Sequence, residues 1–142
     1  MAVNREKILS NLKEADLYQL LQKYWIDIVD NNLTNSNSII DWYVPSTNTW
    51  IEGKCRPRHW DALLIERSKW NALMQKENAY YINSTPKGIF VFDIKQLEEP
   101  VWDFNKMAKS TYFEGSGTKI EKDSGYYPIS KASFQLDQIL IN

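Results

Sequence analysis

Cysteine and histidine are almost missing from this chain of 142 residues, which has one of each. The single Cys55 excludes an internal disulfide, so a reducing compartment is the simplest location, and we expect a cytoplasmic protein. The lone His59 has no partner that suggests a zinc site or a catalytic triad. Long apolar runs are also missing: none approaches the roughly 20 residues that span a bilayer. The segment after Met1 is charged throughout, so we expect neither a secretory signal nor a membrane partner.

An excess of charge of one sign is missing as well. The chain has 17 basic and 18 acidic side chains and a net charge of −1, which argues against a non-specific coat on nucleic acid. The segment between Trp50 and Trp70 is nevertheless locally basic, because its basic residues outnumber its acidic ones. The composition, with 43% hydrophobic and 25% charged residues, predicts one globular domain over residues 1–142.

The pattern of apolar residues predicts both helices and strands. Residues 5–29 have helical periodicity, with a break near Asp16, a residue suited to begin a second helix. Two β-rich runs, 39–44 and 49–55, flank a turn-forming segment and predict a β-hairpin. Further elements are expected in the following order: a helix over 61–75, strands over 79–83 and 88–94, a mobile loop over 114–118, a short strand from Tyr126 and a helix from Ser130. This order indicates an α/β (α+β) fold with a mixed β-sheet.

The predicted hairpin brings two acidic side chains together. If residues 45–48 form the loop, Val44 pairs with Thr49 and Asp41 lies opposite Glu52. Directly opposed Cβ atoms are roughly 5 Å apart, and like charges at this distance are destabilising unless something compensates them. A divalent cation compensates, since hard cations prefer carboxylate oxygens. Lys54 shares the face of Glu52, where it can orient a water or steady a phosphate, so this set suits metal-assisted phosphodiester hydrolysis.

These residues resemble the motif of the PD-(D/E)XK nuclease superfamily, which includes restriction endonucleases, Holliday-junction resolvases and phage or repair exonucleases. The resemblance rests on Ile40-Asp41, an 11-residue step and Glu52-Gly53-Lys54 followed by a helix, and it spans about residues 8–94. Ile40 stands where the name-giving proline would be. The resemblance implies a restriction-endonuclease-like fold, a mixed β-sheet flanked by helices. It also implies that Asp41 and Glu52 hold Mg²⁺ (or Mn²⁺) and that Lys54 is the catalytic lysine.

An acid on the first helix, which many members carry, corresponds to Glu14 and would be a further metal ligand. Three basic residues after the hairpin are the candidate nucleic-acid contacts: Arg56 on the face of Lys54, Arg58 in the next loop and Lys69 on the next helix. We therefore expect a metal-dependent, structure-specific deoxyribonuclease of phage or mobile-element origin. A homodimer would fit, because cleavage of a duplex needs two active centres.

Two other interpretations remain open. The chain could be a nuclease-fold protein that binds nucleic acid without cleaving it, although the complete set of Asp41, Glu52 and Lys54 speaks against this. The six tryptophans and eight tyrosines also allow a module that binds sugar or protein through aromatic side chains. A divalent-metal titration distinguishes these functions, because only the nuclease requires a metal site at Asp41 and Glu52.

Overall fold

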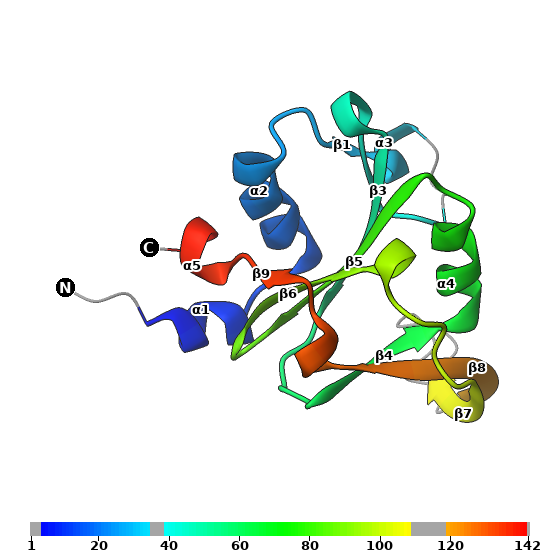
Figure 1. Cartoon of the computed structure of the whole chain (residues 1–142). Coiled ribbons are helices and arrows are strands. Elements are labelled where there is room, and N and C mark those ends of the chain that lie inside the picture. Colours follow the sequence, from blue (N-terminus) through cyan, green and yellow to red (C-terminus); the bar gives the residue numbers. More distant parts are fainter. Residues whose placement is uncertain (1–3, 35–38, 109–118, 142) are drawn as a thin grey trace.

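The computed structural model describes residues 4–34, 39–108 and 119–141, which form two β-sheets and several short helices (Figure 1). The strands are β1 (Val29–Asp30), β2 (Trp42–Val44), β3 (Thr49–Cys55), β4 (Ala62–Glu66), β5 (Asn78–Thr85), β6 (Gly88–Asp93), β7 (Asp103–Ala108), β8 (Lys119–Pro128) and β9 (Phe134–Gln135). The α-helices are α1 (Arg5–Ser10), α2 (Glu14–Tyr24), α3 (Asn31–Thr34), α4 (Arg67–Met74) and α5 (Asp137–Leu140). Short 3₁₀ helices are η1 (Pro45–Thr47), η2 (Ile94–Gln96) and η4 (Ile129–Lys131).

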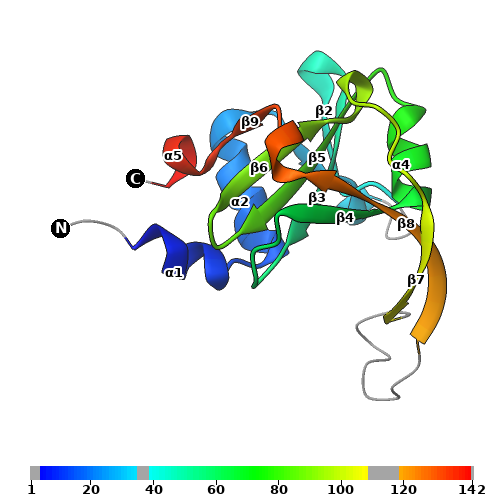
Figure 2. The ribbon, with the colours of Figure 1, turned by 60° about the horizontal axis from the view of Figure 1, so that its bottom comes forward.

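The larger sheet has the strand order β1-β2-β3-β5-β6-β9, and the smaller has the order β4-β8-β7. Within the larger sheet β3 runs parallel to β5, whereas the other described neighbours are antiparallel. This confirms the predicted mixed sheet. The connection from β3 to β5 passes through β4 and α4, so it carries the first strand of the second sheet with it. Figure 2 shows β7 and β8 reaching away from the main sheet.

Buried apolar side chains form two clusters, one on each face of the larger sheet. The first lies under α1, α2 and α5 and includes Leu17, Leu21 and Ile51. The second lies between the sheet, α4 and the smaller sheet and includes Leu73 and Phe92. The central strands are therefore covered on both sides by packed elements (Figure 1). Within the described ranges no helix is long and apolar enough to cross a membrane.

The predicted hairpin forms with the predicted register, but its first strand covers only Trp42–Val44 rather than residues 39–44. Val44 pairs with Thr49, and the pairing continues to Trp42 and Ile51. Asn48 closes the turn with a φ of 48°, the left-handed conformation that asparagine tolerates better than most residues. The two later strands are also confirmed, as β5 and β6, with their turn around Pro86.

The helix predicted over residues 61–75 is wrong in its first half. Residues 62–66 form β4, in which Leu63 and Ile65 are buried and Leu64 is only partly buried. This alternation matches a strand, and its partner is β8, far along the chain. Only α4, from Arg67, keeps the predicted helix, because pairing with β8 overrides the local helical pattern.

Two other predicted helices are shorter than expected. The segment over residues 5–29 divides into α1 and α2, and by Val29 the chain is already in a strand. Asp16 does not precede α2 but lies in its first turn, where Oδ2 accepts the backbone N–H of Lys13 at 3.0 Å. The helix predicted from Ser130 is a single 3₁₀ turn, and α5 begins only at Asp137. The loop predicted over residues 114–118 lies outside the described residues.

Candidate active site

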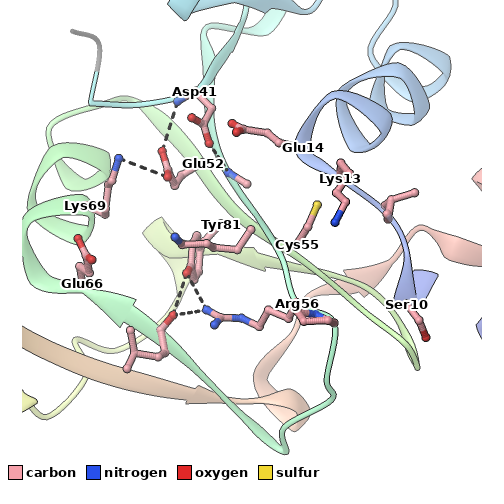
Figure 3. Close-up of a pocket in the computed structure, with 15 residues that line it drawn as sticks. Ser10, Lys13, Glu14, Asp41, Glu52, Cys55, Arg56, Glu66, Lys69 and Tyr81 are labelled. Atoms are coloured by element: carbon pink, nitrogen blue, oxygen red, sulfur yellow. Dashed lines mark hydrogen bonds and ion pairs between the residues drawn. The ribbon is translucent and has the colours of Figure 1, made fainter. Parts of the chain in front are cut away.

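A cavity of about 590 Å³ opens beside the second half of β3 (Figure 3). Strand β2 pairs with β3 only over Thr49–Ile51, whereas β5 pairs with it over Thr49–Cys55. The edge of β3 beyond Ile51 is therefore free of a neighbouring strand on the β2 side, and side chains from several elements line the space. The charged lining residues are Lys13, Glu14, Asp41, Glu52, Lys54, Arg56, Glu66 and Lys69.

Asp41 and Glu52 are held against each other at the closed end of the cavity. The backbone N–H of Asp41 donates to Glu52 Oε1 at 3.3 Å. In the other direction, the N–H of Gly53 donates to Asp41 Oδ2 at 3.0 Å. These are hydrogen bonds between backbone and side chain, beyond the last paired residues Trp42 and Ile51, and they bring the two acids together as predicted.

Glu52 lies in an environment that opposes its ionisation. Its side chain is only 5% exposed. Burial, followed by repulsion from Asp41, raises the pKa of Glu52 to about 8, while Lys69 and Lys54 act in the opposite direction. The Nζ atom of Lys69 lies 3.4 Å from Glu52 Oε2. The pocket therefore holds a carboxyl group that gains from any additional positive charge.

Glu14 is the first residue of α2 and turns toward Asp41 at the rim of the cavity (Figure 3). Its helix is fixed by Leu17 and Leu21, which are fully buried in the first cluster. Desolvation, followed by the neighbouring Asp41 carboxylate, raises the pKa of Glu14 to about 7. The acid predicted from the first helix thus joins the other two from a different element.

The two predicted lysines enter the cavity from different sides. Lys54 extends from β3 with an exposed side chain, and its charge lowers the pKa of both Glu14 and Glu52. Lys69 comes from α4, and its side chain is 28% exposed. Lys54 is thus open to a ligand entering from solvent, whereas Lys69 already has a partner within the protein.

The two predicted arginine contacts differ from each other. Arg56 donates through Nε to Asn83 Oδ1 at 2.7 Å and through Nη2 to the Leu64 carbonyl at 2.7 Å. Its Nη2 also lies 3.2 Å from the hydroxyl of Tyr81, so these donors are directed to protein groups. Arg58 is exposed in the following loop and is not among the residues that line the cavity.

The cavity is also lined by residues that were not singled out from the sequence, among them Lys13, Glu66 and Tyr81. Tyr81 is buried, and its hydroxyl donates to the Leu64 carbonyl at 2.8 Å. Glu66 ends β4, so recognition of that strand would have been needed to place it. Lys13 lies in the break between α1 and α2, directly before α2, and only the packing of α2 brings it to the cavity.

The donor set suits a hard divalent cation better than zinc. Among the described residues no group of three or more His, Cys, Asp or Glu side chains could hold a metal ion, so Glu14 does not complete a three-carboxylate site with Asp41 and Glu52. Mg²⁺ does not need such a group, because it usually takes one or two carboxylates together with water and substrate oxygens. Asp41 and Glu52 fit that requirement, and a cation bound to both would offset the repulsion between their carboxylates.

Comparison with protein-family models, with curated proteins and with solved structures gives no match for this chain. The side chains that line the cavity are therefore the basis for a proposed function.

Proposed function

We propose that the chain is a Mg²⁺- or Mn²⁺-dependent nuclease that hydrolyses phosphodiester bonds in DNA. The observation that carries this proposal is the contact between Asp41 and Glu52 in a cavity that Lys54 also lines. The mixed sheet with helices on both faces supports a restriction-endonuclease-like fold of the PD-(D/E)XK type. One difference from the motif is that β4 lies between the Glu52-Gly53-Lys54 strand and the helix that follows it.

Each residue of the site has a distinct role in this proposal. Asp41 and Glu52 would hold the cation, with Glu14 as a further carboxylate at the rim. When bound, the cation supplies polarisation of the phosphate and a water of lowered pKa. Lys54, exposed at the cavity, places a positive charge where negative charge develops on the scissile phosphate. Burial and the neighbouring Asp41 raise the pKa of Glu14, which suits a carboxylate that accepts a proton from an attacking water.

A homodimer follows from the same proposal if the substrate is a duplex. The described part of the chain supplies one such pair of acids, and two strands require two cuts. Arg58, exposed outside the cavity, would then contact the DNA backbone away from the scissile bond. The structure-specific action expected from the sequence belongs to this proposal as well.

The aromatic residues offer less support for a sugar-binding module. Trp42, Tyr81 and Tyr127 are buried in the two clusters. Among the described aromatic side chains, three are largely exposed: Tyr24 in α2, Trp60 in the loop after β3, and Tyr126 in β8. The aromatic content is therefore used largely for packing.

Cleavage of labelled DNA tests the proposal. Linear duplex, single strand, flap and four-way junction substrates are incubated with the purified chain and Mg²⁺ or Mn²⁺, with EDTA as the blank. We expect metal-dependent cleavage of at least one substrate. Lys54→Ala and Asp41→Asn should each lower its rate by at least about 100-fold, as the loss of one transition-state contact does elsewhere. Lys131→Ala, an exposed lysine on η4, is the matched control. Wild-type rates in either site variant, with the fold verified by circular dichroism, would contradict the assignment.

A further inference from the structure

Lys69 connects two segments that carry the acidic residues. From the first turn of α4, its Nζ lies 3.4 Å from Glu52 Oε2 and donates to the carbonyl of Ile39. Ile39 is two residues before Asp41, so one ammonium group contacts both β3 and the segment that leads into β2. The Glu52 side chain of this ion pair is only 5% exposed. The pair therefore differs from solvated surface ion pairs, which contribute little to stability.

The Glu52 carboxylate is fixed at both oxygens. Oε1 accepts the backbone N–H of Asp41 at 3.3 Å, and Oε2 faces the Lys69 ammonium. A carboxylate oxygen has two acceptor sites, so each oxygen keeps one for a cation. The carboxylate is therefore oriented before any cation arrives, and neither contact prevents its coordination.

Attachment of α4 does not depend on Lys69. Leu73 of the same helix is fully buried in the second cluster. Trp70 donates through Nε1 to the hydroxyl of Tyr127 at 3.1 Å. Since these two contacts hold the helix against the rest of the protein, the position of Lys69 is set by the helix rather than the reverse.

We infer that Lys69 is a positioning residue that orients Glu52 and the Ile39–Asp41 segment for a divalent cation. This inference rests on the proposed function, because it requires a cation site at Asp41 and Glu52. It also replaces the DNA contact expected of Lys69, whose ammonium already has two partners within the protein. Groups that orient a metal ligand typically change metal affinity about 10- to 100-fold when they are removed.

Calorimetric titration of the metal-free protein with Mn²⁺ and Mg²⁺ tests the inference without a cleavage assay. We expect Lys69→Met to raise the dissociation constant by about tenfold or more. Lys69→Arg should recover part of the loss, because a guanidinium can still donate to both acceptors. In a Glu52→Gln background, Lys69→Met should cause a smaller further loss than in wild type, because only its contact with the Ile39–Asp41 segment then remains to be removed.

Lys76→Met is the matched control. Its ammonium lies over the Trp50 ring, 4.0 Å from the centroid, and Lys76 does not line the cavity. The affinity of this variant should equal that of wild type. If Lys69→Met does not fold, Lys69→Gln replaces it, since glutamine keeps a donor for the Ile39 carbonyl but lacks the charge.

The outcomes separate this inference from the proposed function. Absence of Mn²⁺ and Mg²⁺ binding by wild type would overturn both. Binding by wild type with an unchanged dissociation constant in Lys69→Met would overturn only the role of Lys69. Tighter binding by Lys69→Met would also overturn it, because the lysine would then compete with the cation instead of preparing its site.

Discussion

The two halves of β3 differ in which groups form hydrogen bonds with their backbone on the β2 side. Over Thr49–Ile51 the strand has β2 on one side and β5 on the other. Beyond Ile51 the pairing with β2 ends, and the side chain of Asp41 accepts the N–H of Gly53. Charged side chains thus gather where the regular ladder ends and backbone N–H groups donate to side chains instead. The fully paired half holds the other half in place.

The largest change in the free energy of unfolding is expected from Gly53→Ala, in the half of β3 that does not pair with β2. A Cβ at this position would lie 2.3 Å from Cζ3 and 2.4 Å from Cη2 of Trp42. The Trp42 ring is buried and stacks on Tyr18 with the centroids 5.9 Å apart, so it has little room to move. We expect a loss of about 3 kcal/mol in the free energy of unfolding, at the upper end of typical overpacking costs. Urea denaturation measures it, and a loss below about 0.5 kcal/mol, the usual range for surface changes, would refute the close approach.

A smaller effect is expected where β3 ends. Arg56→Met removes donors from Asn83 and from the Leu64 carbonyl. We expect the free energy of unfolding to fall by about 1–3 kcal/mol, because partly buried acceptors lose their partners. Arg58→Ala should change it by no more than about 0.5 kcal/mol, as exposed substitutions generally do. Thermal or urea unfolding compares the two. If Arg56→Met is as stable as Arg58→Ala, the stabilising role of Arg56 is wrong, and the DNA contact predicted for it from the sequence stays a prediction.

A further effect concerns the dependence of stability on pH. The pKa of Glu52 is about 8 in the folded protein, against an ordinary value of 4.5. The folded state therefore binds this proton more tightly than the unfolded state. The resulting stability is complete below about pH 4.5 and is lost as the pH rises to about 8. Glu14 acts in the same direction up to about pH 7.

The Glu52→Gln variant isolates the contribution of Glu52, because glutamine does not ionise. In EDTA, its melting temperature should rise relative to that of wild type as the pH increases from 5 to about 8. Saturating Mg²⁺ should reduce the difference in melting temperature between Glu52→Gln and wild type, because it would stabilise only wild type. A melting-temperature difference that does not change with pH would show that the Glu52 carboxyl group is solvated in the folded protein.

The approach of Asp41 to Glu52 was predictable from sequence because it depends on a single turn. Residues 45–48 fix the hairpin register, which places Asp41 beside Glu52, where hydrogen bonds link the two residues. The Lys69 contact with Glu52 depends on where α4 packs, and the Arg56 network depends on β4 and β5. The pairing of Leu64 with Tyr126 joins residues 62 positions apart, which no local pattern reveals. For this reason the local pattern predicts a helix over residues 61–75, although residues 62–66 form β4.

Leu64 belongs to two assemblies at the same time. Its backbone pairs with Tyr126 in the smaller sheet, whereas its carbonyl oxygen accepts hydrogen bonds from Arg56 and Tyr81 at the wall of the cavity. The smaller sheet, from which β7 and β8 extend (Figure 2), is therefore joined to the wall of the cavity through the backbone of Leu64.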